Sequence, residues 1–383
     1  MVTGQRSRFS LPLLGVEEEF LVVDAGNGEV VPQAAAVIAR ASRRLGARVG
    51  GEITKLQVET RTDPCRTIAD LEAQLADGRA VSQSAAVSLG LRVIASASPV
   101  LGPAVPAPIT EGPRQDRGNA AFRGLHDDVA TCAVHVHVEE HDRDRAVLIS
   151  NHLRQHLPVL LALAANSPYW SQRDTGYASW RSVIWQRWPV AGPPPFLTSA
   201  AQYDAHVDTL LEAGALVDRG TIFWDVRPSA HKPTLEVRVA DVAVTAVDAA
   251  ALAALVRALV MIAGSAVDSG DEGPALLPEM MRLAYWRAAR DGMGGHGVDV
   301  LTGRLLPAAA LAARLVRLAQ PALEETGDHE RVQGWLARLA STGDGAARQR
   351  AAAARRGRLG DVVDALAAWT APGLPVREES TLT

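Results

Sequence analysis

The 383-residue sequence has only two cysteines, Cys65 and Cys132, which lie far apart and form no CxxC pair. Such cysteine usage indicates free thiols in a reducing compartment rather than a disulfide framework. The N-terminal region also lacks a long apolar run, because the carboxylates at residues 17–19 come where a signal peptide would continue with apolar residues. We therefore expect a cytoplasmic protein.

Neither sign of charge is in large excess, since 39 basic and 43 acidic residues give a formal net charge of −4. This balance provides no general attraction to nucleic acid or to anionic membranes. The most apolar run, residues 249–267, is interrupted by Arg257 and is typical of a buried core helix rather than a membrane span. We therefore expect small-molecule partners, with no nucleic acid and no membrane among them.

Two common catalytic motifs are missing as well. The sequence contains no Walker A motif and no GxSxG nucleophile elbow. The glycine-rich stretch DGMGGHG, residues 291–297, follows a helix-like segment and lacks the lysine and hydroxyl of a P-loop. We interpret it as a loop that ends a helix.

One stretch makes an unusual use of histidine, CAVHVHVEEHD at residues 132–142. Side chains of a β-strand point alternately to its two faces. His135 and His137 therefore share one face, while the valines beside them share the other. The valine face predicts a core contact, whereas the histidine face needs a functional explanation.

The same alternation recurs in four other segments, at residues 15–23, 56–61, 221–229 and 233–241. Their polar faces carry Glu17 and Glu19; Gln57, Glu59 and Arg61; Asp225 and Arg227; and Thr234, Glu236 and Arg238. Strands that are polar on one face and apolar on the other fit an antiparallel or mixed sheet. Such a sheet packs one face on helices and leaves the other face open.

Stretches with helical periodicity separate these strands, at about 33–47, 67–90, 142–165, 199–217, 246–268, 305–325 and 344–370. We therefore expect an α+β fold with helices packed on the apolar face of the sheet. No domain boundary is evident, which predicts one catalytic domain over residues 1–383. Its strands are expected at about 15–241 and a helical C-terminal layer at about 246–370.

Two long loops stand out between these elements. Residues 99–118 are rich in proline and glycine, which is typical of a lid or a disordered segment. Residues 166–195 contain four of the eight tryptophans. Aromatic residues at this density line a pocket or an interface, or simply pack against one another.

If the strands are neighbours, their polar side chains converge on one surface: Glu17, Glu19, Glu59, His135, His137 and Glu236, with Arg61, Arg227 and Arg238 nearby. Clustered carboxylates repel one another unless positive charge lies among them. Carboxylates with an occasional imidazole suit Mg²⁺ or Mn²⁺ better than zinc, and arginines on the same face suit phosphate oxygens. The pattern therefore indicates nucleotide chemistry that depends on a divalent cation.

Six motifs occur along the chain in the order GVEEEF, LQVETRTDPCRT, CAVHVHV, ANSPYW…DTGYASWR, WDVRPS…PTLEVRVAD and GAARQR. In this order they resemble the carboxylate–amine ligases of the glutamate–cysteine ligase type 2 family, over roughly residues 12–370. The resemblance implies a glutamine-synthetase-like fold, whose antiparallel sheet forms a funnel lined with metal-binding carboxylates. It also implies that ATP phosphorylates a carboxylate, here glutamate, and that an amine then attacks the acyl phosphate.

The resemblance also implies a role for individual residues. The ligands of Mg²⁺ or Mn²⁺ are expected to be Glu17, Glu19, Glu59, His135, His137 and Glu236. Nucleotide phosphates are expected to contact Arg227, Arg238 and His137, and the expected catalytic residues are Glu59, Arg227 and Arg238. Substrate contacts are expected from Arg61, Asn166, Tyr177 and Arg181, and GAARQR is expected to contact substrate or nucleotide.

Some questions stay open at this point. The segments SASP (Ser96–Pro99) and PRQDRG depart from the family pattern, which leaves the acceptor amine undetermined. A guanidino kinase-like phosphotransferase, a metal-dependent hydrolase and a non-catalytic nucleotide-binding relative are alternative functions. ATP dependence and amide formation distinguish them. The Ala/Leu-rich helices suit a homodimer as well as an internal core, so the oligomeric state also stays open.

Overall fold

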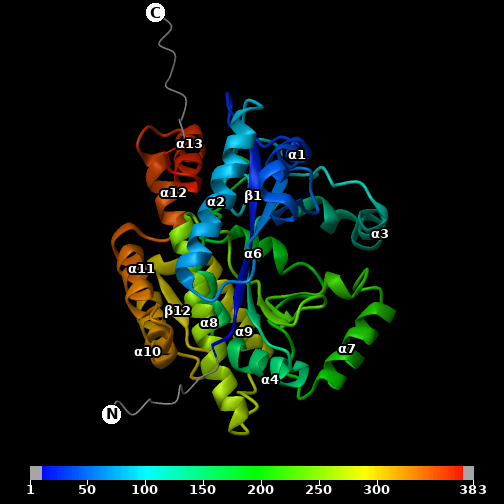
Figure 1. Cartoon of the computed structure of the whole chain (residues 1–383), viewed down its shortest axis with the longest axis vertical. Helices are drawn as coiled ribbons and strands as arrows, with labels where there is room; N and C mark the ends of the chain where they lie inside the picture. The colour runs from blue at the N-terminus through cyan, green and yellow to red at the C-terminus, as the bar shows by residue number, and fades with distance from the viewer. Residues whose placement is uncertain (1–10, 374–383) are drawn as a thin grey trace, which may run out of the picture.

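The computed structural model describes residues 11–373, which form helices around a seven-stranded antiparallel sheet (Figure 1). Strand β1 (Leu14–Asp24) runs through the middle of this sheet. On one side, the first half of β1 pairs with β5 (Val134–Glu139) and its last residues pair with β4 (Leu91–Ile94). On the other side, β1 pairs with β3 (Gln57–Arg61). The outer strands are β11 (Thr234–Val237), β10 (Val226–Pro228) and β2 (Val49–Gly51).

The register of the strands gathers the polar residues on one face. Residues directly opposite each other in neighbouring antiparallel strands point to the same side of the sheet. The opposing pairs are Glu17 with His135, Glu19 with Glu59, Glu236 with His137, and Arg227 with Glu236. The expectation that separated strands bring their polar faces together is confirmed.

The opposite face of the sheet is apolar and covered by helices. Val16, Val136 and Leu235 are buried in one core cluster with side chains of α8 (Ala246–Asp268) and α2 (Ile68–Val87). Helix α8 is long and apolar enough to cross a membrane by length and composition alone, yet 78% of its most apolar window is buried inside the protein. The prediction that this segment is a core helix is confirmed.

A buried ion pair lies on this helix-covered face. Glu18 of β1 accepts a hydrogen bond from Nε of Arg79 at 3.0 Å, and both side chains are excluded from solvent. The Arg79 guanidinium also donates to the backbone oxygens of Ala243 and Val244, at 2.8 and 3.0 Å. The pair therefore fixes α2 to the sheet and to the segment before α8.

The remaining helices are α1 (Ala34–Leu45), α3 (Pro113–Phe122), α4 (Arg143–Arg154), α5 (Leu157–Ala164), α6 (Trp180–Trp185), α7 (Ala200–Glu212), α9 (Pro278–Asp291), α10 (Ala308–Thr326), α11 (His329–Thr342), α12 (Gly345–Ala354) and α13 (Leu359–Thr370). Two predicted helices are each divided in two. The stretch 142–165 divides before Pro158, which lacks a backbone N–H, and 344–370 divides near Gly357, whose φ is +68°.

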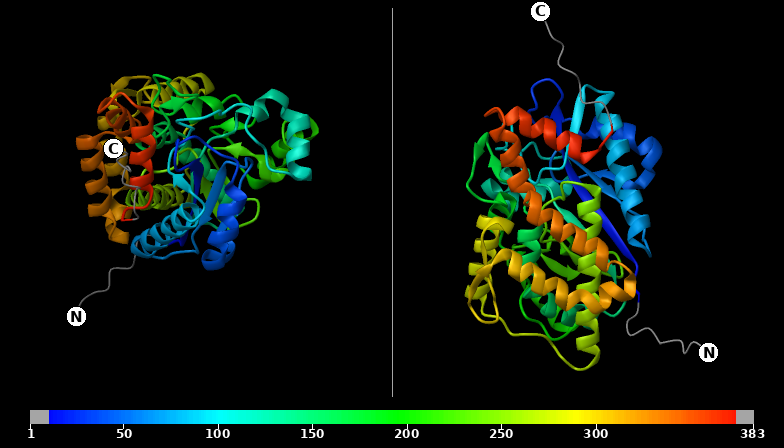
Figure 2. Two further views of the ribbon diagram at one scale, coloured as in Figure 1. Left: turned by 90° about the horizontal axis from the view of Figure 1, so that it is seen from above. Right: turned by 90° about the vertical axis from the view of Figure 1, so that its left-hand side faces the viewer.

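The sequence led us to expect an entirely helical C-terminal region, but the structure differs. It contains a hairpin of β12 (His296–Val298) and β13 (Leu305–Pro307), which packs against α9 and α10. The glycine-rich residues 292–297 do end α9, as predicted, and they lead into this hairpin. Helices α10–α13 lie on one side of the molecule, and α3 and α7 lie on the other (Figures 1 and 2).

The expected strand at 221–229 is interrupted at Asp225. Its first part, β9 (Phe223–Trp224), pairs in parallel with β8 (Ala191–Gly192), whereas its second part is β10 of the main sheet. The Asp225 N–H donates to the oxygen of Gly192 at 2.8 Å, and the Asp225 oxygen accepts from the N–H of Arg238 at 2.7 Å. Because the chain switches partners here, the expectation that Asp225 and Arg227 share one continuous strand face is wrong.

The two long loops contain short regular elements. The segment expected to be a loop at 99–118 leads into α3, which begins at Pro113. The tryptophan-rich segment forms a hairpin of β6 (Tyr169–Trp170) and β7 (Arg173–Asp174), followed by α6. Both segments therefore supply ordered walls beside the polar face of the sheet.

Candidate active site

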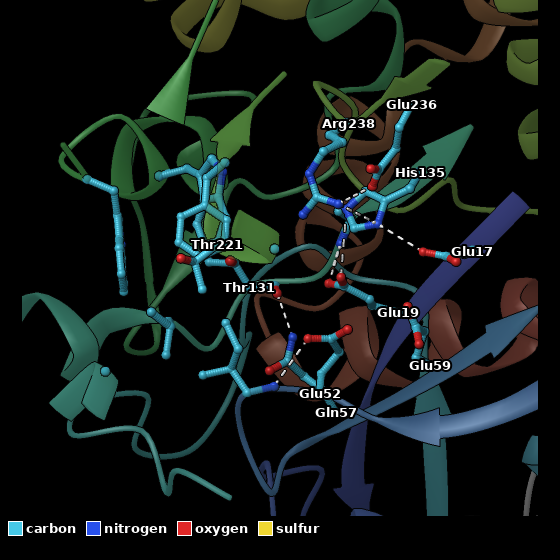
Figure 3. A pocket seen from close by; sticks show the side chains of 18 of the residues that line it. Glu17, Glu19, Glu52, Gln57, Glu59, Thr131, His135, Thr221, Glu236 and Arg238 are labelled. Atoms are coloured by element: carbon cyan, nitrogen blue, oxygen red, sulfur yellow. Dashed lines mark hydrogen bonds and ion pairs between the residues drawn. The ribbon is translucent and has the colours of Figure 1, made fainter. Parts of the chain in front are cut away.

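The polar face of the sheet forms the floor of a cavity of about 380 Å³, which we call the sheet cavity. Its lining includes ten of the residues singled out from the sequence: Glu17, Glu19, Glu59, Arg61, His135, His137, Arg181, Arg227, Glu236 and Arg238. Figure 3 shows the carboxylates of Glu17, Glu19 and Glu236 gathered around His135. The sheet thus collects acidic, basic and imidazole groups from five strands and α6 at one place.

Glu17 lies at the centre of the acidic group. Its carboxylate oxygens lie 3.7 Å from Nδ1 of His135 and 3.6 Å from Nε2 of His137. Burial raises the pKa of Glu17, but the two nearby histidines outweigh burial and lower this pKa below its usual value. Lys232, in the turn between β10 and β11, also donates to Glu17 at 2.7 Å. Glu17 is therefore held as a carboxylate anion and is paired with the cationic Lys232.

Glu236 is held between two arginines. Its carboxylate lies 3.1 Å from Nε of Arg227 and forms a closer ion pair with Arg238. Burial alone raises the pKa of Glu236, yet Arg238 and then Arg227 lower it well below the usual range. The Arg238 guanidinium also contacts Nδ1 of His135 at 3.3 Å. Burial and this nearby arginine lower the pKa of His135 to about 4, so its imidazole is neutral at pH 7.

Glu19 and Glu52 form a second acidic pair in the sheet cavity. Burial, and then the negative charge of Glu52, raise the pKa of Glu19 to about 8. Burial also raises the pKa of Glu52. Glu19 accepts a hydrogen bond from the backbone N–H of Ala133 at 2.8 Å, which opposes the shift only in part. Two neighbouring carboxylates that resist ionisation are suited to receive a cation.

Two sets of three side chains have ligand atoms close enough to hold one metal ion each. They are Glu17, Glu59 and His135, and Glu17, His137 and Glu236. The buried Nε2 of His137 has no hydrogen-bond partner in the described part of the chain, although its Nδ1 contacts Thr234 Oγ1 at 2.9 Å. An imidazole fixed at one nitrogen and free at the other is typical of a metal ligand. The residues present therefore fit a pair of divalent cations.

A separate cleft, which we call the edge cleft, borders the same acidic group. It has a volume of about 250 Å³ and is lined by both Glu17 and His137. Most of its remaining wall is apolar and comes from the start of β1 and from the proline residues Pro64 and Pro233. A flat apolar group can therefore lie beside the acidic group without entering the sheet cavity.

The expected substrate residues Asn166 and Tyr177 do not line either cleft. The buried amide of Asn166 donates to the backbone oxygens of Ala95 and Val242, at 2.8 and 2.9 Å, and accepts from Gln349 at 2.8 Å. The Tyr177 hydroxyl instead accepts from the indole N–H of Trp286 at 3.2 Å. Asn166 therefore joins the segments after β4 and before α8 to α12, and Tyr177 contacts α9.

The motif GAARQR contacts the chain rather than the cavity. Arg350 forms two hydrogen bonds with the carboxylate of Asp174, at 2.7 and 2.6 Å, and also donates to the backbone oxygen of Tyr177 at 2.9 Å. Two motifs of the resemblance are therefore joined to each other by an ion pair. The expectation that GAARQR contacts substrate or nucleotide has no support from its position.

Several lining residues were not singled out from the sequence. Glu52 follows the short strand β2 outside any alternating pattern, and Lys232 lies in a turn. One end of the cavity is aromatic, with Phe122, Trp185, Trp188 and Phe223 in its wall. The density of tryptophan at residues 166–195 is the sequence signal for this end, since it indicated a pocket, an interface or simple packing.

The comparisons with known proteins agree on one family. The family model described as glutamate–cysteine ligase family 2 (GCS2) matches residues 13–365. A protein of Mycobacterium sp. (strain KMS) with the provisional name glutamate–cysteine ligase 2-2 is 45% identical over 362 residues, which is 94% of this chain and 98% of that protein. A relative from Nocardia farcinica, provisionally named glutamate–cysteine ligase 2-1, is 45% identical over 340 residues, 88% of each chain.

Solved structures share the fold at low sequence identity. The glutamate–cysteine ligase of Francisella tularensis, solved in complex with AMP, matches 94% of this chain and 88% of its own with a TM-score of 0.66 and 12% identity. A bifunctional glutathione synthetase of Pasteurella multocida matches 94% of this chain with a TM-score of 0.67 and 16% identity. The match spans 52% of that bifunctional protein, about half its length. The expected glutamine-synthetase-like α+β fold is confirmed.

Proposed function

This chain belongs to the glutamate–cysteine ligase 2 family, and we propose that its sheet cavity performs ATP-dependent ligation of a carboxylate to an amine. Glutamate is the proposed carboxylate, because it is the acid named in the family and in its relatives. The observation that carries this proposal is the position of two three-residue ligand groups that share Glu17 and adjoin the buried arginines Arg227 and Arg238.

The acidic groups would hold Mg²⁺ or Mn²⁺. The first group offers Glu17, Glu59 and His135, the second offers Glu17, His137 and Glu236, and Glu19 and Glu52 lie beside them in the same cavity. Oxygen ligands with a single imidazole fit these hard cations better than zinc. When bound, the cations neutralise the charge of the nucleotide phosphates and so favour phosphoryl transfer.

The chain itself positions both substrates. The apolar edge cleft is the proposed site of the nucleotide base, because it opens beside Glu17 and His137, where the phosphates would lie. Arg181 donates to the backbone oxygens of Arg238 and Val239, at 3.1 and 3.2 Å, and the side chains of Arg181 and Arg238 both line the sheet cavity. Two such arginines are suited to bind the carboxylate that is to be phosphorylated.

The reaction then needs no covalent enzyme nucleophile. An oxygen of the substrate carboxylate attacks the γ-phosphorus of ATP, and ADP leaves with the electron pair of the broken P–O bond. The amine nitrogen next attacks the acyl carbon, inorganic phosphate leaves, and one proton is released. Arg227 and Arg238 would stabilise the charge on the transferring group, because both are fixed in place by Glu236 before substrate arrives.

The direct test is ADP release from Mg²⁺-ATP and glutamate, with and without a panel of amines, followed by mass spectrometry of the products. We expect ADP formation that depends on an amine, together with a new amide of matching mass. ADP formation with a phosphorylated acceptor and no amide would identify a phosphotransferase instead. Hydrolysis without any nucleotide would contradict the proposal. The buried free thiols of Cys65 and Cys132 suit the proposed cytoplasmic location.

A further inference from the structure

The end of the sheet cavity away from the acidic group has an aromatic wall. It is formed by Phe122, Val129, Trp185, Trp188, Val217 and Phe223. Ring centroids lie 4.6 Å apart for Phe122 and Trp188, 4.8 Å for Trp185 and Phe223, and 5.3 Å for Trp188 and Phe223. These rings come from α3, α6 and its following turn, and β9, so three separate segments meet there. We call this set the aromatic wall.

The aromatic wall begins directly beside the arginines of the proposed carboxylate site. The Arg181 guanidinium lies over the ring of Trp185, 6.0 Å from its centroid, and the same guanidinium bonds to the backbone oxygen of Arg238. Thr221, two residues before Phe223, lies across the cavity from Glu17 and Glu59 (Figure 3). A molecule against the aromatic wall therefore approaches the acyl group from the side opposite the acidic cluster.

We propose that the aromatic wall binds the acceptor, and that the acceptor is a primary amine carrying an aromatic ring. This inference rests on the proposed ligase function and specifies its second substrate. Aromatic side chains gain affinity from edge-to-face or offset contacts with other rings, in addition to the apolar area they bury. The side chain of cysteine is a single sulfur atom on one methylene, which has no ring to make such contacts.

The edge cleft, which we propose holds the nucleotide base, is separate from the aromatic wall. The edge cleft adjoins Glu17 and His137, which belong to the metal-ligand groups, whereas the aromatic wall adjoins Arg181. A base in the edge cleft and an amine at the aromatic wall thus place the phosphates and the acyl carbon between them. The amine nitrogen then attacks the acyl carbon, the C–O bond to phosphate breaks, and phosphate leaves with the electron pair.

The first experiment compares nucleophiles of different size on the wild-type enzyme with Mg²⁺-ATP and glutamate. Hydroxylamine, which is too small to need the aromatic wall, reports the acyl phosphate as a hydroxamate. We expect kcat/KM for 2-phenylethylamine to exceed that for methylamine and for cysteine at least about tenfold, since even one methylene in an apolar pocket changes it by about 10–200-fold. Hydroxamate formation with equal or better use of methylamine or cysteine would overturn the acceptor inference alone. Absence of hydroxamate would overturn the ligase function and this inference with it.

A matched pair of variants tests the aromatic wall itself. Trp188 and Trp170 belong to the same buried core cluster, and of the two only Trp188 lines the sheet cavity. We expect Trp188→Leu to lower the ratio of kcat/KM for 2-phenylethylamine to that for hydroxylamine at least about tenfold. Trp170→Leu should leave this ratio unchanged, although thermal melts should show both variants destabilised.

Isothermal titration with 2-phenylethylamine, in the presence of glutamate and a non-hydrolysable ATP analogue, gives a readout independent of turnover. Trp188→Leu should lose this binding, and Trp170→Leu should keep it. An unchanged ratio in Trp188→Leu, or a rise in its KM for ATP without loss of amine binding, would show that the aromatic wall does not hold the acceptor.

Discussion

Each face of the sheet carries a buried glutamate that is paired with arginine, and the two glutamates allow structural and catalytic effects to be separated. Glu236 faces the sheet cavity and pairs with Arg227 and Arg238. Glu18 faces the core and pairs with Arg79. Because both carboxylates are almost fully buried, neutralising either one leaves a buried arginine with less compensating charge. We therefore expect Glu236→Gln and Glu18→Gln to lose similar amounts of stability but to differ in their effect on activity.

The expected loss of stability follows from the geometry. At 3.1 Å and an effective dielectric constant of about 20, the Coulomb attraction between Glu236 and Arg227 is about 5 kcal/mol. Desolvation of both ions offsets much of this attraction in the intact pair, but removing one partner of a buried pair costs about 3–5 kcal/mol. We expect a loss of that size for each variant, measured by urea unfolding in the presence of a chelator.

The expected loss of activity differs between the two variants. Glu236→Gln removes a candidate metal ligand and releases the two arginines that it orients, so kcat for hydroxamate formation should fall at least about 100-fold. Glu18→Gln should keep the wild-type kcat below its unfolding temperature, since its side chain points away from the cavity. Full activity in Glu236→Gln, or an equal loss in Glu18→Gln, would refute this division of roles.

Further expected outcomes concern Arg238, Glu19 and Asn166. Arg238→Ala should slow hydroxamate formation about 100-fold or more while circular dichroism stays unchanged, and wild-type kinetics would remove Arg238 from the mechanism. In metal-free protein the raised pKa of Glu19 means that the folded state binds more protons than the unfolded state between pH 4.5 and about 8. Stability should therefore fall as pH rises through this range, and Glu19→Gln should weaken that fall; urea midpoints that do not change with pH would contradict it. Asn166→Ala should lower stability by about 1–3 kcal/mol without changing KM for ATP or glutamate, and a raised KM would place Asn166 at the substrate after all.

The polar face of the sheet could be predicted from the sequence because the strand period is two. A shift of one residue would turn every side chain of a strand to the other face, so alternation in β1, β3, β5 and β11 determines which residues meet if the strands are neighbours. Glu17 and His135, more than a hundred residues apart, are opposite each other for this reason. The valines that alternate with the histidines are buried, as the same argument requires.

Other parts of the cavity carry no periodic signal. Glu52 and Lys232 lie in turns, and their positions depend on how the chain returns to the sheet after β2 and β10. Asn166 and Tyr177 show the opposite problem, because their motifs resemble the family but the residues connect other segments of the chain rather than line the cavity. A family motif combines residues required for packing with residues required for chemistry. Only the three-dimensional contacts distinguish the two kinds.

The central claim is that a carboxylate is activated as an acyl phosphate in the sheet cavity. It is tested most directly with glutamate labelled with ¹⁸O in both carboxylates, incubated with Mg²⁺-ATP and an accepted amine. Because phosphate leaves with an oxygen of the substrate carboxylate, we predict that the released inorganic phosphate carries one ¹⁸O atom. Released phosphate that carries no ¹⁸O, formed together with the amide, would contradict the acyl-phosphate mechanism.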